Sequence, residues 1–133
     1  MTNVLIVDDH AFVRACLRAL LEGEDDIQVV GECADGADLL SVSAAVEVDV
    51  VLMDLRMPRV SGIDATRMLL ASDRTPRVLL MTSRITGDDV ARAADAGAAG
   101  FLLKGGAPEL LLEAIRTVAR GGSAWLGEIA AVV

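Results

Sequence analysis

Five short apolar runs, each followed by a stretch with helical spacing, constrain the fold of this chain more than any other feature. The runs are four to seven residues long, as expected for buried strands, and cover residues 4–7, 27–33, 48–53, 77–81 and 100–103. The intervening stretches repeat apolar residues at three- and four-residue intervals, and we expect helices at 11–22, 35–46, 62–71, 86–97 and 108–121. This alternation predicts an α/β fold built from parallel βαβ units, with right-handed crossovers and helices on both faces of the sheet.

Helix-end signals and polar interruptions refine that prediction. Ser61 is a candidate N-cap, Thr86 precedes an acidic first turn, Gly97 is a stop, and Pro108 suits the first position of a helix. The run at 27–33 contains polar residues, which favours a strand that lies at the edge of the sheet or is half exposed.

Composition narrows the class of protein. A chain of 133 residues suits one domain. It has no run of about 18 apolar residues and no signal peptide at its N-terminus, which favours a cytoplasmic protein with no membrane partner. Cys16 and Cys33 lie in apolar patterns, which predicts buried, reduced thiols. The net charge of −8 argues against direct nucleic-acid binding by this segment.

Four of the five predicted strands end in residues that can do chemistry. Each alone could be a turn residue, but parallel strands bring their carboxyl ends to one edge of the sheet, where ligands bind in such folds. Their joint placement therefore predicts a site formed by Asp8, Asp9, Asp54, Thr82 and Lys104.

The chemistry expected of this site follows from its charges. Converging carboxylates repel one another unless a cation joins them, and Asp oxygens suit Mg²⁺. Asp8 and Asp9 are candidate metal ligands, whereas Asp54 stands alone on a central strand as a candidate nucleophile that could form an acyl phosphate. Lys104 and Thr82 would suit phosphoryl oxygens. The alternative is an acidic cluster that only forms ion pairs with Lys104.

Four motifs occur in the order and spacing typical of one family: 7–10 (VDDH), 52–58 (LMDLRMP), 81–83 (MTS) and 100–104 (GFLLK). Over about residues 3–121, the chain resembles the receiver domain of a two-component response regulator. The Lys104-Gly105 junction and the Asp-Asp-His run are most similar to the NarL/FixJ subfamily, whose receivers precede a LuxR-type helix-turn-helix. The resemblance implies a flavodoxin-like (βα)5 doubly wound parallel sheet with strand order 2-1-3-4-5.

The resemblance also implies roles for single residues. Asp54 would accept a phosphoryl group from a sensor histidine kinase, with Thr82 and Lys104 contacting that group. Mg²⁺ would be bound by Asp8, Asp9, Asp54 and the backbone carbonyl of Arg56.

Thr82 and Phe101 would switch the face made by the fourth helix, fifth strand and fifth helix. Phe101, here in place of the frequent Tyr, could instead be an ordinary packed aromatic residue. The resemblance implies a phosphorylation switch and not an enzyme, apart from assistance to its own phosphorylation and dephosphorylation. A homodimer would form on phosphorylation through this face or through the first and fifth helices.

Two arginines follow the site residues at the same spacing. Arg56 and Arg84 lie two residues beyond Asp54 and Thr82, and either gate water near the acyl phosphate or are solvated surface charges. An aspartyl-phosphate phosphatase is disfavoured, because Arg56 stands where such an enzyme needs a second carboxylate. We expect His10 to be a loop residue.

For the domain organisation, we expect a receiver at 1–121 and a linker at 122–133. The linker would lead to a C-terminal DNA-binding domain missing from this chain, through which the protein regulates transcription. The alternatives are a frayed terminus and a stand-alone receiver that signals by protein contact without binding DNA.

Overall fold

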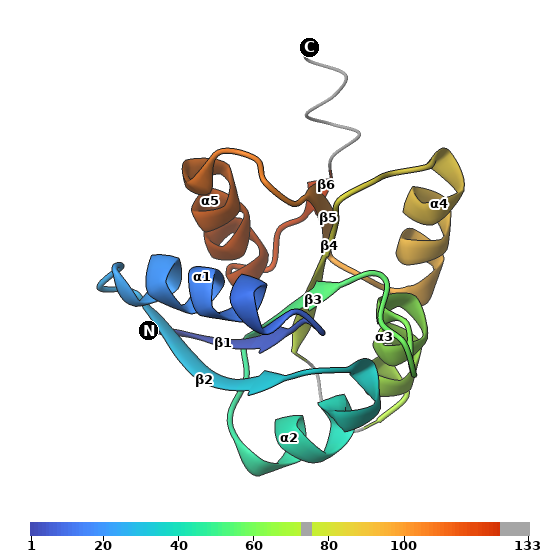
Figure 1. The fold of residues 1–133 in the computed structure, drawn as a ribbon, viewed down its shortest axis with the longest axis horizontal. Helices are drawn as coiled ribbons and strands as arrows, with labels where there is room; N and C mark the ends of the chain where they lie inside the picture. The colour runs from blue at the N-terminus through green and yellow to red at the C-terminus, as the bar shows by residue number, and fades with distance from the viewer. Residues whose placement is uncertain (73–75, 126–133) are drawn as a thin grey trace.

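The computed structural model describes residues 1–72 and 76–125, in which strands and helices alternate as predicted (Figure 1). The strands are β1 (Thr2–Val7), β2 (Ile27–Cys33), β3 (Val50–Asp54), β4 (Arg77–Thr82), β5 (Gly100–Leu103) and β6 (Ala124–Trp125). The helices are α1 (Ala11–Glu22), α2 (Leu39–Ala45), α3 (Gly62–Leu70), α4 (Gly87–Ala96) and α5 (Pro108–Ala119). A short 3-10 helix, η1 (Gly36–Asp38), precedes α2, so the helix predicted at 35–46 is divided in two.

The strands form one parallel sheet in the order β2-β1-β3-β4-β5-β6. The predicted order 2-1-3-4-5 is confirmed, and β2 lies at the edge of the sheet as its polar interruptions indicated. The sixth strand was not predicted. It is two residues long and pairs with β5, where Ala124 lies opposite Gly100 and Trp125 opposite Phe101.

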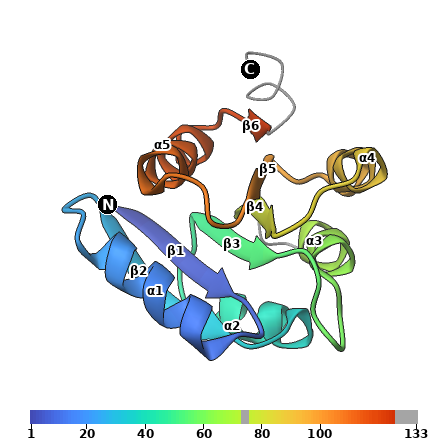
Figure 2. The same cartoon turned by 45° about the horizontal axis from the view of Figure 1, so that its top comes forward.

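Helices cover both faces of the sheet (Figures 1 and 2). One core cluster joins α2, α3 and α4 to the sheet through Leu39, Leu69 and Ala93, and the other joins α1 and α5 to it through Leu21 and Ile115. Residues of β1 and β3 alternate between the two clusters, so both faces of these strands are buried. Each fully buried aliphatic side chain contributes about 1.5–3 kcal/mol, which anchors the strands that end at the candidate site.

The four helix-end residues named in the sequence lie at helix ends in the structure. The Ser61 hydroxyl accepts the Asp64 N–H at 3.2 Å, and Thr86 and Asp89 form a capping box at the start of α4. Gly97 ends α4 with a φ of 97°, and Pro108 lies in the first turn of α5.

The prediction for the cysteines is half right. Cys33 is buried, which raises the pKa of its thiol to about 11. Cys16 is exposed, so the prediction of a buried thiol there was wrong. It lines an apolar groove between α1 and α5, beside the exposed Phe12, because the stripe of α1 that packs on the sheet is narrower than the apolar pattern suggested. Among the described residues, no helix is long and apolar enough to cross a membrane.

Candidate functional site

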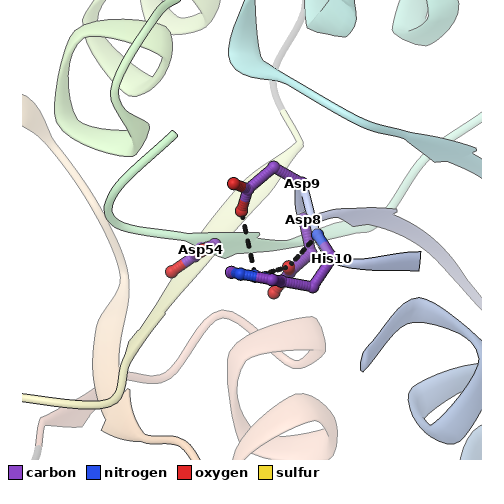
Figure 3. Close-up of side chains that lie close together, drawn as sticks. All are labelled: Asp8, Asp9, His10 and Asp54. Carbon is purple, nitrogen blue, oxygen red and sulfur yellow. Dashed lines mark hydrogen bonds and ion pairs between the residues drawn. The ribbon is translucent and has the colours of Figure 1, made fainter. Parts of the chain in front are cut away.

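The carboxyl ends of β1 and β3 bring an acidic cluster together. Asp8 and Asp9 follow β1 directly and Asp54 ends β3; with His10, they offer ligand atoms that all lie within 4.8 Å of one another (Figure 3). Asp8 is fully buried and Asp54 is 5 % exposed. The three acids singled out in the sequence therefore lie at one place, held there by the two central strands.

Lys104, in the turn after β5, lies between two of these acids. Its Nζ is 2.7 Å from Asp8 Oδ2 and 3.2 Å from Asp54 Oδ2. Burial opposes the charge on this lysine, but the hydrogen bond and charge of Asp8 and the charge of Asp54 outweigh it and raise the pKa of Lys104. For Asp54, burial is the strongest influence and raises its pKa, although Lys104 partly offsets it. The ion pairs of the structural alternative thus exist, and they involve the same acids that a metal ion would need.

The backbone near Asp54 is fixed by neighbouring segments. The Leu55 N–H donates to the Met81 carbonyl at 2.7 Å, and the Gly62 N–H donates to the Leu55 carbonyl at 2.8 Å. Gly62 approaches so closely that a Cβ atom there would collide with the Asp54 carbonyl oxygen. The first residue of α3 therefore packs directly on the backbone that carries Asp54.

Thr82, the last residue of β4, is buried, and its hydroxyl is bonded within the loop before α4. The hydroxyl donates to the Arg84 carbonyl at 2.8 Å and accepts from Arg56 Nη1 at 3.0 Å. Phe101 is fully buried in the core cluster that contains Leu80, and Trp125 is one of the partly buried residues packed against that cluster. By strand alternation, Thr82 continues the series of Val78 and Leu80, which lie in that cluster, so Thr82 and Phe101 belong to the same side of the sheet.

Arg56 is bound to its surroundings and is not simply a solvated charge. Its Nη2 lies 2.9 Å from Asp89 Oδ2 in the first turn of α4, and its Nη1 also reaches the Arg84 carbonyl at 3.3 Å. Burial opposes ionisation of Asp89, but hydrogen bonds from Arg56 and Thr86 outweigh it and hold the pKa of Asp89 below its ordinary value. Arg84 itself is exposed, and its backbone atoms make the contacts described.

Three residues of this region were missed in the sequence. His10 Nδ1 lies 3.3 Å from Asp8 Oδ1 and 3.2 Å from Asp9 Oδ1, so the expected loop residue is part of the acidic cluster. Asp89 was predicted only as one acid of the first turn that follows Thr86. Asp35 accepts backbone N–H groups of both Ala37 and the loop at 59–60, at 2.9 to 3.0 Å, which ties the turn after β2 to the loop after β3. The signal for Asp35 was its position after a strand, shared with Asp8 and Asp54.

The donor atoms of the cluster fit a hard divalent cation. Three carboxylates from two strand ends supply oxygen ligands, and two of these groups are largely buried. Oxygen-rich sites that leave room for water suit Mg²⁺ better than softer transition metals.

Comparison with known proteins defines the family. The model of the response regulator receiver domain matches residues 4–116. The response regulator UvrY of Escherichia coli O6:H1 is 44% identical over 121 residues, covering 91% of this chain and 56% of UvrY. The nitrate/nitrite response regulator protein NarP of Escherichia coli K12 is 41% identical over 119 residues, covering 90% of this chain and 55% of NarP.

A solved structure agrees with the sequence comparison. The signal receiver domain of the putative response regulator NarL from Mycobacterium tuberculosis matches with a TM-score of 0.86 and 33% identity, covering 90% of this chain and 97% of that one. The chain therefore belongs to the response regulator receiver family. Within it, the chain is of the NarL/FixJ type, as the similarity to NarP and NarL indicates. The chain spans little more than half the length of the curated relatives it matches.

Proposed function

We propose that this protein is a phosphorylation switch in which Asp54 accepts a phosphoryl group from a sensor histidine kinase. The observation that carries the proposal is the position of the Asp54 carboxylate, beside Asp8 and Asp9 and 3.2 Å from the Lys104 ammonium. An Asp54 oxygen would form the new bond to phosphorus while the bond to the donor histidine nitrogen breaks, and that nitrogen leaves with the bonding electron pair.

The other site residues assist this transfer by charge and position. Asp8, Asp9, Asp54 and the backbone carbonyl of Arg56 would hold Mg²⁺, which supplies positive charge to the phosphoryl oxygens when bound. Lys104 already lies beside both buried acids and would compensate the charge added at Asp54. The chain is thus a substrate of its kinase and not an enzyme, although these groups also assist its own phosphorylation and dephosphorylation.

Thr82 and Phe101 would convert the modification into a change of surface. When the Thr82 hydroxyl moves to the phosphoryl group, Phe101 on the same side of the sheet repacks and alters the face formed by α4, β5 and α5. Phe101 is completely buried, so its side chain could change rotamer only if its neighbours move.

The output we propose is transcriptional. Residues 1–121 form the receiver, and 122–133 lead to a C-terminal DNA-binding domain. The greater length of the relatives supports this. So do the similar proteins LiaR of Bacillus subtilis, a transcriptional regulatory protein, and RcsB of Salmonella, whose structure has been solved bound to a promoter. We place the protein in the cytoplasm with its kinase. Most of the linker, 126–133, lies outside the described residues. The sequence of the reading frame after Val133 tests this proposal. If no DNA-binding domain follows, the alternative of a stand-alone receiver that signals by protein contact would be favoured.

Intact mass spectrometry tests the phosphoacceptor directly. Incubation with acetyl phosphate and Mg²⁺ should add one phosphoryl group to the parent protein and none to Asp54→Asn. Asp64→Asn removes an exposed acid of α3 outside the site and should leave the reaction unchanged. A stable adduct in Asp54→Asn would contradict the assignment, and full modification after removal of divalent cations would contradict the metal site.

A further inference from the structure

Arg56 joins the loop after β3 to two parts of the segment that follows β4. Its Nη1 contacts the Thr82 hydroxyl at 3.0 Å and the Arg84 carbonyl at 3.3 Å, and its Nη2 lies 2.9 Å from Asp89 Oδ2. Asp89 is 7 % exposed and is fixed by the capping box with Thr86. The guanidinium therefore rests on an anchored carboxylate, and that contact determines where the rest of its donors point.

This arrangement occupies the bonding capacity of the Thr82 hydroxyl. Its proton is donated to the Arg84 carbonyl at 2.8 Å, and its oxygen faces Arg56 Nη1 and, at 3.3 Å, the Arg84 N–H. A hydroxyl has one proton to donate. It can donate to a phosphoryl oxygen only after the bond to Arg84 is broken, and Arg56 contacts both ends of that bond.

We propose that the Arg56–Asp89 ion pair is a latch that keeps the Thr82 hydroxyl bonded within the loop before α4 and so favours the unphosphorylated form. Asp89 and the Arg56 side chain are positioning residues, because they act through Thr82. The latch rests on the proposed function of Asp54 and concerns how readily that site changes state. A phosphoryl group, or an analogue of it, recruits Thr82 only in molecules where the latch is open. The apparent affinity of the site for such a group is therefore reduced in proportion to the fraction of molecules in which the latch is open.

The strength of the latch follows from its surroundings. The Arg56 side chain is 52 % exposed, whereas that of Asp89 is 10 % exposed, so the pair is partly screened by water. Pairs of this kind are worth up to about a fivefold change in an equilibrium. Opening the latch should therefore change binding by about two- to fivefold.

The test uses beryllofluoride with Mg²⁺ as a stand-in for the phosphoryl group. Its half-saturation concentration is measured from the backbone amide NMR signals of Thr82 and Arg84. We expect Asp89→Asn and Arg56→Met each to lower this concentration by about two- to fivefold, and the double variant to lower it no further than either alone. Asn can still accept the Thr86 N–H, and substitution of the Arg56 side chain leaves its backbone carbonyl in place. Asp88→Asn removes the neighbouring exposed acid and should match the parent.

A second measurement separates the latch from a merely structural role of the ion pair. If the pair is a latch, the Arg84 amide signal of each unliganded single variant should shift part of the way toward its beryllofluoride-bound position. Loss of helix stability alone would not move the signal in that direction. Unchanged half-saturation in Asp89→Asn, or additive effects in the double variant, would overturn the latch. Failure of the parent protein both to bind beryllofluoride and to accept phosphoryl from acetyl phosphate would overturn the proposed function, and the latch with it.

Discussion

At the scale of single residues, the surroundings of Asp54 in the fold disfavour the charged form of its carboxyl group. Burial raises the pKa of Asp54 above its ordinary 3.8, despite Lys104. An acid with a raised pKa in the folded state stabilises the fold below its unfolded pKa. That contribution is lost as the pH rises through the folded pKa. The ionised acid that the proposed reaction needs is thus maintained at the expense of stability.

Asp54→Asn should therefore unfold at a higher temperature than the parent protein at pH 7. The difference should shrink as the pH falls through the raised pKa of Asp54 and vanish below the ordinary aspartate pKa of about 4, where the parent carboxyl is protonated in both the folded and the unfolded state. Mg²⁺ should also reduce the difference in unfolding temperature, since a bound cation stabilises the ionised Asp54 of the parent protein. Thermal unfolding followed by circular dichroism at both pH values, with and without Mg²⁺, measures this. An Asn variant less stable than the parent at pH 7 would show that the acid contributes favourably to the fold.

The residues that meet at the acidic site could be predicted because strand ends are visible in the sequence. Asp8, Asp54 and Lys104 each follow or end an apolar run, and parallel strands gather such positions. The contact between Arg56 and Asp89 could not be predicted, because it joins the loop after β3 to the first turn of α4, 33 residues further along the chain. No local pattern specifies which acid an arginine will reach. The roles assigned to Thr82, Phe101 and the metal ligands remain predictions.

At the scale of elements, the start of α3 determines where the β3 strand end lies. Gly62→Ala would place a methyl group against the Asp54 carbonyl and, at 2.9 Å, against Leu80. Alanine favours a helix over glycine by about 1 kcal/mol, but overpacking against backbone costs about 1–3 kcal/mol. We expect Gly62→Ala to lower the free energy of unfolding in urea by up to about 2 kcal/mol. Gly87→Ala is the matched control, because nothing lies within 4 Å of its added Cβ, and it should not be destabilised.

The elements themselves were largely predictable from period and end signals. The strands at 27–33 and 100–103 and the helix at 11–22 have the expected bounds. The helix predicted to begin at residue 35 begins later, at Leu39. The Asp35 side chain accepts the Ala37 N–H, which favours a 3-10 turn before the helix. A strand as short as β6 has no measurable period. It forms only because β5 offers a free edge within reach of the turn at 121–122.

At the scale of the whole molecule, we expect phosphorylation to strengthen self-association. Elements of both candidate faces carry exposed apolar side chains, Leu103 of β5 and Phe12 of α1, and both residues line the groove of about 550 Å³ between α1 and α5. Sedimentation velocity of the acetyl phosphate-treated protein should shift from monomer toward dimer. An unchanged profile would contradict the prediction. Loss of the shift in Phe12→Ser would assign the dimer to the α1 and α5 face.

Strand β6, which was not predicted, contains the one tryptophan of the sequence and so determines the fluorescence of the protein. The sequence contains one tryptophan and no tyrosine, so absorption and emission near 280–350 nm come almost entirely from Trp125. That indole is half-buried, and its residue is paired across the sheet edge with Phe101. The chain thus carries a single native fluorophore next to the side chain proposed to change rotamer. It can report its own conformational state without any label, from within the segment that would lead to the output domain.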